Sequence, residues 1–306
     1  MKSTDINIPL ALILALILTI LMGCNKTIEE VRNTKVNQPI TKDEKVEESE
    51  DISQLDFISS DGTTIMERFN PPEGYERISY EKESFGYFLQ RLPLKAFGEK
   101  VYHFDGREKT REVHISVIDM DTGDRDLQQC ADAIMRLRGE YLYHSEQYEK
   151  IHFNFTNGFT AAYIKWLEGY RISVDNNEVN WYLGTTYDDS YETFRKYMDI
   201  VFAYAGTLSL SKELIEVESL EQMKAGDIFI KGGSPGHAVI VVDVVINPET
   251  NNRLFLLAQS YMPAQDMHIL INPTDEHLSP WYSIEFDTLV TPEWTFDKTH
   301  YMRFQD

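Results

Sequence analysis

Cys130 and His237 are the two side chains in this sequence best suited to covalent chemistry. The thiolate of cysteine is a strong nucleophile, and an imidazole held in place can remove the proton of such a nucleophile. His237 follows the glycine-rich turn at residues 232–236 and begins the β-branched apolar run at residues 238–245, which predicts a buried strand. A histidine at this junction is a candidate general base, although it can equally serve only to begin the strand.

The sequence around Cys130 predicts an amphipathic helix over residues 126–143, with Asp126 as its N-cap and Gln129 completing a pattern like a capping box. Cys130 then lies in the first turn or so, on the apolar face. The positive end of a helix lowers the pKa of a thiol near it, and a neighbouring histidine would complete the activation. The alternative interpretation is that Cys130 is a small core residue.

A third candidate, Gln259, ends the strand predicted at residues 254–259. If this strand returns antiparallel to residues 238–245, His237 and Gln259 lie at the same end of the hairpin and can point to one face. Gln259 would then orient the imidazole through its amide oxygen, or it is a satisfied buried amide. Asp243 shares the face by parity, but it is about 20 Å along the strand from His237 and is rejected as its partner.

No metal and no cofactor is predicted. The histidines show neither an H-E-x-x-H pattern nor a paired C-x-x-C. The glycine-rich turn at 232–236 lacks the lysine of a phosphate-binding loop. Asp266 and His268, near predicted strand ends, are weaker site candidates.

Residues 1–23 read as a signal peptide, with Lys2 before an apolar run at residues 8–22. The sequence Leu21-Met22-Gly23-Cys24 resembles the lipobox of bacterial lipoproteins. This resemblance implies that Cys24 is diacylated and becomes the new N-terminus, so the protein is extracytoplasmic and lipid-anchored to the inner or the outer membrane. A membrane anchor without lipid is the alternative.

Cys24 and Cys130 are the only cysteines, so lipidation of Cys24 leaves Cys130 without a disulfide partner. An unpaired thiol in an exported protein is a candidate reactive group.

Residues 24–55 are predicted to be a flexible acidic linker, because they carry many charges and no aromatic residue. Residues 56–306 are predicted to form a single globular domain. The formal net charge of −21 argues against nucleic acid and anionic lipid as partners, since both require a positive surface.

Two resemblances bear on the globular domain. Its sequence blocks are similar to those of a bacterial lipoprotein family catalogued as a domain of unknown function, which implies no activity. These blocks are residues 125–143, 151–159, 205–214, 226–244 and 256–266.

The domain also resembles the NlpC and papain-like cysteine peptidases. In both, a cysteine begins a helix, a histidine begins a later strand, and a polar residue lies on the next strand. The resemblance implies an α+β fold with a papain-like or NlpC-like core, in which the helix carrying Cys130 packs on an antiparallel sheet. It implies Cys130 as nucleophile, His237 as base and Gln259 as orienting residue. Gln128 is an oxyanion candidate, because papain has a glutamine upstream of its cysteine.

The sequence also departs from that pattern. Gln129 and Ala131 flank Cys130, whereas NlpC-type enzymes usually carry Asp-Cys-Ser, and residues 151–205 would be a central insertion. We therefore expect a membrane-anchored thiol hydrolase that cleaves amide bonds in peptides or peptidoglycan, or a non-catalytic envelope binding or scaffold lipoprotein with the same fold.

Overall fold

The computed structural model describes residues 57–305. The predicted signal peptide at residues 1–23, the lipidation site Cys24 and the linker at 24–55 lie outside the described residues. Within the described part of the chain, no helix combines the length and the apolar character that crossing a membrane would require.

The described chain contains six α-helices and fifteen strands. The helices are α1 (Ile65–Arg68), α2 (Phe85–Gln90), α3 (Cys130–His144), α4 (Tyr163–Leu167), α5 (Tyr191–Tyr204) and α6 (Thr207–Glu213). The strands are β1 (Glu76–Arg77), β2 (His114–Val117), β3 (His152–Asn154), β4 (Thr160–Ala162), β5 (Tyr170–Asp175), β6 (Glu178–Leu183), β7 (Ile215–Glu216), β8 (Asp227–Lys231), β9 (His237–Ile246), β10 (Arg253–Gln259), β11 (His268–Leu270), β12 (Tyr282–Ser283), β13 (Thr288–Val290), β14 (Thr295–Asp297) and β15 (Tyr301–Arg303).

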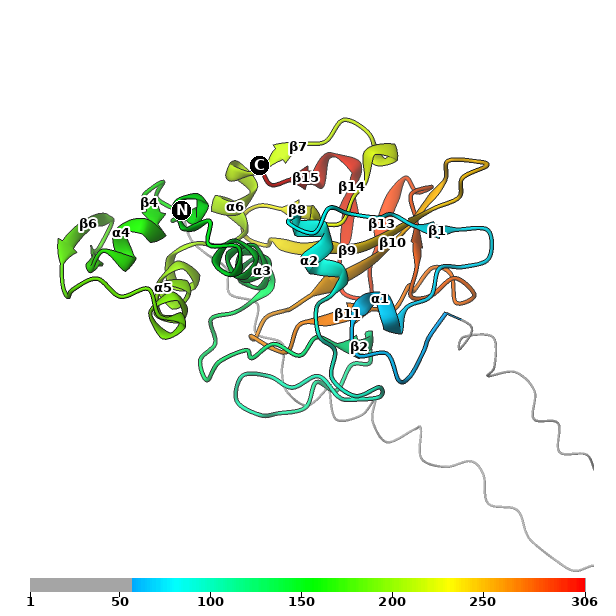
Figure 1. The fold of residues 1–306 in the computed structure, drawn as a ribbon, viewed down its shortest axis with the longest axis horizontal. Coiled ribbons are helices and arrows are strands. Elements are labelled where there is room, and N and C mark those ends of the chain that lie inside the picture. Colours follow the sequence, from blue (N-terminus) through cyan, green and yellow to red (C-terminus); the bar gives the residue numbers. More distant parts are fainter. Residues whose placement is uncertain (1–56, 306) are drawn as a thin grey trace, which may run out of the picture. The chain divides into compact units, whose positions relative to one another are not determined.

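Nine of these strands form one antiparallel sheet, in the order β2-β11-β10-β9-β8-β15-β7, with β1 paired to β9 and β12 paired to β10. Helices α2 and α3 lie over one face of its centre, as Figure 1 shows. Helices packed on an antiparallel sheet confirm the predicted α+β class.

The central strand β9 is covered on both faces. Ile240 belongs to the larger apolar cluster, which includes Ile134 of α3, whereas Val239 belongs to the second cluster with Phe229. Because both faces are buried, the strand reads as a continuous β-branched run rather than an alternating one.

A β-bulge in β9 corrects one expectation from parity. The register shifts between the pairs Leu256↔Asp243 and Leu257↔Val241, so one extra residue enters β9. Asp243 therefore faces away from the side that His237 faces. It is fully buried and accepts hydrogen bonds from Arg77 and Gln90, each at 2.8 Å.

The helix that carries Cys130 begins three residues later than the predicted N-cap at Asp126 implies. The N-cap is Gln129, whose backbone N–H donates to Asp132 Oδ2 at 3.1 Å. Asp126 instead accepts the backbone N–H of Ala264 at 2.7 Å and Nε2 of Gln129 at 3.0 Å. Cys130 is consequently the first residue of α3.

Residues 151–205, predicted as a central insertion, contribute no strand to the large sheet. Their strands form two hairpins of their own, β3-β4 and β5-β6, and helices α4 and α5 accompany them. In Figure 1 these elements gather beside α3, at one side of the sheet.

Candidate functional site

Cys130 lies at the amino end of α3 and is half-buried. Its sulfur is within hydrogen-bonding reach of the backbone N–H of Ala238, the residue after His237. The helix start and the beginning of β9 therefore meet at this thiol. The predicted position at a helix start, facing the protein, agrees with the structure.

His237 is the first residue of β9, and its side chain is almost completely buried. The imidazole packs against three aromatic rings, with centroid distances of 4.8 Å to Tyr261, 5.4 Å to Trp294 and 6.0 Å to Phe296. These rings hold the imidazole in one orientation and keep water from most of its surface.

Gln259 ends β10 and contacts His237 as its position predicted. Its Oε1 lies 2.9 Å from Nε2 of His237, and its side chain is fully buried. An amide oxygen only accepts hydrogen bonds, so Nε2 carries the proton and donates it to Gln259. Nδ1 is then the ring nitrogen that can accept a proton from another group.

Cys130 and His237 line the same cavity, whose volume is about 590 Å³. Tyr261, Met262 and Trp294 form part of its wall, and of the described residues that line it only Asp126 and Asp132 are aspartate, glutamate, lysine or arginine. The structure therefore brings the predicted nucleophile and base to one cavity, with Gln259 behind the base.

Burial, not the helix end, dominates the protonation of this site. Desolvation raises the pKa of Cys130 to about 11, with the nearby Asp132 as a further cause. Desolvation also lowers the pKa of His237 to about 4, against the opposing effect of the hydrogen bond to Gln259. The expected lowering of the thiol pKa by the helix is thus outweighed, and the resting pair is a neutral thiol beside a neutral imidazole.

Gln128 does not reach this cavity with its side chain. The side chain is fully buried, Oε1 accepts from Arg136 Nη1 at 3.0 Å, and Nε2 lies 3.4 Å from the carbonyl oxygen of Asp121. These contacts point the amide away from Cys130, so an oxyanion contact must come from another donor. Backbone N–H groups in the first turn of α3 are available, because the first amides of a helix have no intrahelical acceptor.

Ser260 ties the segment before Cys130 to the end of β10. Its Oγ lies 3.1 Å from the backbone oxygen of Gln128 and 2.8 Å from that of Gln265. The hydroxyl is fully buried. This contact fixes the loop that carries the thiol relative to the strand that carries Gln259.

Sequence reasoning missed the groups behind Gln259. Its Nε2 donates to Glu293 Oε2 at 2.8 Å, and the other carboxylate oxygen of Glu293 accepts from Lys109 Nζ at 2.8 Å. His268, a weaker candidate from sequence, lies across from Gln259 on β11. Glu293 and Lys109 lie in connecting segments far apart in the chain, and no spacing or motif joins them to His237.

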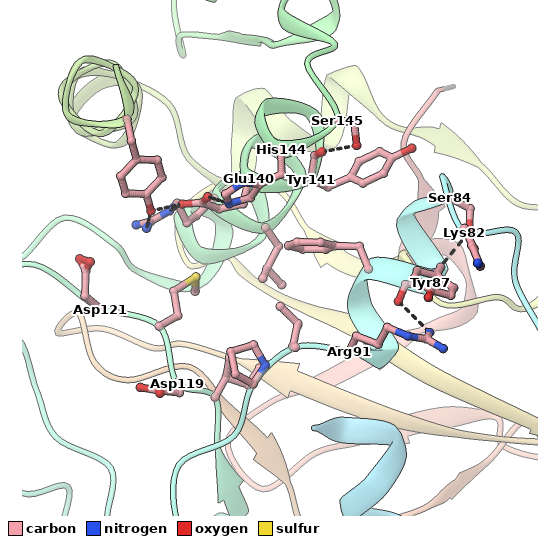
Figure 2. Close-up of a pocket in the computed structure, with 18 residues that line it drawn as sticks. Lys82, Ser84, Tyr87, Arg91, Asp119, Asp121, Glu140, Tyr141, His144 and Ser145 are labelled. Atoms are coloured by element: carbon pink, nitrogen blue, oxygen red, sulfur yellow. Dashed lines mark hydrogen bonds and ion pairs between the residues drawn. The ribbon is translucent and has the colours of Figure 1, made fainter. Parts of the chain in front are cut away.

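A second cavity, of about 540 Å³, lies on the α2 side of α3 and contains neither Cys130 nor His237. Figure 2 shows Asp119 and Asp121 on one side of it and Lys82 and Arg91 on the other. Half of its lining residues are apolar or aromatic, namely Tyr87, Phe88, Leu92, Pro93, Ile118, Met120, Leu137, Tyr141 and Tyr191, and the other half are polar or charged.

Arg136 and Glu140 of α3 face this second cavity. Arg136 Nη2 donates to the hydroxyl of Tyr191 at 2.9 Å, and that hydroxyl donates to Glu140 Oε1 at 2.7 Å. Through Gln128, the same arginine connects this cavity to the segment before Cys130. Among residues 57–305, no three His, Cys, Asp or Glu side chains are grouped so that they could hold a metal ion.

A family model described as "Domain of unknown function (4846)" matches residues 65–303. Comparison with curated proteins found no match, and comparison with solved structures found none either.

Proposed function

Because the chain belongs to the family of the domain of unknown function (4846), whose description names no activity, we propose its function from its side chains: a thiol hydrolase of amide bonds with a papain-like core. Cys130 is the nucleophile, His237 the base and Gln259 the orienting residue. The observation that carries the proposal is the cavity lined by both Cys130 and His237, with Gln259 hydrogen-bonded to Nε2 of the imidazole.

The chemistry proceeds in two halves. In the first, Sγ of Cys130 attacks the carbonyl carbon while Nδ1 of His237 takes the thiol proton. The C–N bond breaks, the imidazolium returns the proton to the leaving amine, and a thioester remains. In the second, His237 removes a proton from water and the resulting hydroxide attacks the thioester carbonyl. The C–S bond breaks, the imidazolium returns the proton to the sulfur, and the product leaves as a carboxylic acid. Backbone N–H groups at the start of α3 stabilise the oxyanion.

The neutral resting pair sets an energetic requirement for this mechanism. Moving the proton from a thiol of pKa about 11 to an imidazole of pKa about 4 costs on the order of 9 kcal/mol before the new charges attract each other. A turnover of about 10 per second corresponds to a barrier of about 16 kcal/mol. The transfer fits within that barrier when it accompanies the attack, so His237 acts as a general base rather than as half of a preformed ion pair.

The cavity wall favours a peptide with little negative charge near the scissile bond. None of the described residues that line the cavity is a lysine or arginine, and two are aspartates. Tyr261 and Trp294 offer aromatic faces, and Met262 is well exposed at the edge. Amide bonds in peptides, including the peptides of a bacterial cell wall, are the substrate class we propose.

Hydrolysis is tested with the purified protein and its Cys130→Ala variant. Each is incubated with peptidoglycan fragments and with peptide libraries, and products are identified by mass spectrometry. New amine and carboxylate ends produced by the wild type alone support the proposal. Equal product profiles for the two proteins over the whole panel would contradict the proposal.

The place of action that we propose is the bacterial envelope, with the protein anchored through acyl chains on Cys24. The support is the lipobox-like sequence alone, since these residues lie outside the described part of the chain. Metabolic labelling with a fatty acid tests it. Label should enter the wild type and not a Cys24→Ala variant, and equal labelling of both would contradict lipidation.

A non-catalytic binding lipoprotein is the second candidate function. It is favoured by the raised pKa of Cys130, which leaves the thiol protonated at rest. It is also favoured by the separate cavity of Figure 2, which combines apolar and aromatic side chains with charged ones. In that case the Cys130→Ala variant keeps all its function in cells, whereas substitutions that fill the second cavity, such as Leu137→Trp, remove it.

A further inference from the structure

Glu293 and Lys109 form a buried ion pair directly behind Gln259. Their side chains are each 8% exposed, and Lys109 Nζ lies 2.8 Å from Glu293 Oε1. Glu293 lies between β13 and β14, and Lys109 lies in the segment before β2. Taking two charges out of water is costly, so a pair at this place calls for an explanation beyond fold stability.

The carboxylate of Glu293 decides which end of the Gln259 amide faces His237. An ionised carboxylate only accepts hydrogen bonds, and Glu293 Oε2 lies 2.8 Å from the amide of Gln259. The NH2 end must therefore point to Glu293, which turns Oε1 toward His237. Because that oxygen also only accepts, the proton of the neutral imidazole must be on Nε2.

His268 favours the same orientation from the neighbouring strand, but more weakly, because its contact with the amide is 3.4 Å long against 2.8 Å for Glu293. Its Nδ1 lies 2.9 Å from the backbone oxygen of Asp266, and a carbonyl oxygen requires a donor, so Nδ1 carries the proton of this imidazole. Burial lowers the pKa of His268 to about 3, which keeps the ring neutral. Its Nε2 is then only an acceptor, and it lies 3.4 Å from Nε2 of Gln259. Both neighbours of the amide need its NH2 end.

We propose that Glu293 and Lys109 are positioning residues that set the tautomer of His237 through Gln259. Lys109 supplies the cation of the pair, at 2.8 Å from Glu293, whereas a buried carboxylate without a cation tends to take up a proton and become a donor. The catalytic consequence rests on the proposed hydrolase function, because only the Nε2–H tautomer leaves Nδ1 free to accept the proton of Cys130. The tautomer itself is measurable whether or not the protein is an enzyme.

The Glu293→Gln variant should reverse the amide. Lys109 donates most strongly to the carbonyl oxygen of the new side chain, so the NH2 end of that side chain faces Gln259. Gln259 then turns its own oxygen toward position 293 and its NH2 end toward His237. Nε2 of His237 becomes the acceptor, and the proton moves to Nδ1. In a serine protease, a change that leaves the histidine in the wrong tautomer lowers kcat by about 10⁴-fold, which bounds the effect on hydrolysis here.

Nitrogen-15 NMR of histidine-labelled full-length protein is the experiment. A His237→Asn variant identifies the His237 signals among those of the eight histidines. In the wild type, Nε2 should resonate as a protonated nitrogen and Nδ1 as an unprotonated one. In Glu293→Gln, the two should exchange roles. Lys109→Met leaves Glu293 in place without its cation and should also move the proton of His237 from Nε2 to Nδ1. This second variant tests the inference if Glu293→Gln does not fold.

Asp243→Asn is the matched control. Like Glu293, Asp243 is a buried carboxylate with a cationic partner, since Arg77 lies 2.8 Å from it. Asp243 lies on β9 and does not contact Gln259. It should lower stability and leave the His237 tautomer unchanged. An Nδ1–H tautomer in the wild type, or an unchanged tautomer in a folded variant of Glu293 or Lys109, overturns the inference. If the variants reverse the tautomer of His237 but the wild type hydrolyses no amide, the inference stands and only the proposed function is contradicted.

Discussion

Gln259 Oε1 lies 2.9 Å from Nε2 of His237, which joins the last residue of β10 to the first residue of β9. The two residues stand at the same end of a hairpin, beside the start of the helix that carries Cys130. The proposed hydrolysis depends on the proton in this hydrogen bond, because a nitrogen of the neutral imidazole that carries a proton cannot act as the base.

The ionisation of Cys130 can be measured by alkylation with iodoacetamide as a function of pH. Since desolvation raises the pKa of the thiol to about 11, the rate should still be rising well above the pKa of a free cysteine, about 8.5. A rate that levels off below about pH 8 would contradict the neutral resting pair and would indicate a thiolate–imidazolium pair instead.

Replacing Gln259 by alanine should lower both activity and stability. Nε2 of His237 loses its acceptor and Glu293 loses a donor, and a buried unpaired polar group costs about 1–3 kcal/mol. Because the imidazole is no longer held in one orientation, kcat should fall by about 10²-fold. Hydrolysis and urea unfolding are the two measurements.

Gln90→Ala is the control for Gln259→Ala. Gln90 is also a buried amide, and its Nε2 donates to Asp243 at 2.8 Å, but it lies away from the cavity of Cys130. A similar loss of stability with full activity is expected. If the two variants lose activity equally, Gln259 has no special part in the site.

Ser260→Ala should loosen the segment that carries the thiol. The hydroxyl holds the backbone of Gln128 at 3.1 Å, and loss of one such hydrogen bond costs about 1 kcal/mol. We expect faster amide hydrogen exchange at residues 126–130 than in the wild type. Ser116→Ala, which removes another buried hydroxyl, one bonded to Arg68 at 3.1 Å, should leave that segment protected. Unchanged exchange in Ser260→Ala would show that the contact does not restrain the loop.

Glu213, at the end of α6, should make stability depend on pH. Burial raises its pKa from its ordinary value of 4.5 to about 7, although the backbone N–H of Asn154 favours the charged form. Between these values the folded state holds a proton that the unfolded chain has lost, so the free energy of unfolding falls as pH rises. The loss, complete above about pH 7, is of order 3 kcal/mol at most.

Urea unfolding of the wild type and Glu213→Gln over this pH range measures the effect. The glutamine keeps an acceptor for Asn154, whose N–H lies 2.7 Å from Glu213 Oε1, and does not titrate. Its stability should fall less than that of the wild type between about pH 5 and about pH 7. Parallel pH dependences would show that Glu213 is not protonated in the folded state.

The sequence by itself determined the local elements and the identity of the main candidates. The β-branched run at residues 238–245 predicts a buried strand, and the helical period places Ile134 and Leu137 on one face of the helix after Cys130, both buried in the structure. Hairpin parity was enough to pair His237 with Gln259, because the strands are adjacent in the chain and only a short turn separates them. The α+β class was implied by the resemblance to the NlpC and papain-like peptidases.

Tertiary structure alone decided how the site is protonated and held. The helix start predicts a lowered thiol pKa, but the packing around Cys130 and His237 removes water from both and reverses the outcome, because desolvation depends on neighbours from the whole chain. A bulge in β9 turned Asp243 to the other face of the sheet, although parity placed it on the same face as His237. Glu293 and Lys109 reach Gln259 from distant connecting segments, and sequence spacing carries no information about a contact that only the closed fold creates.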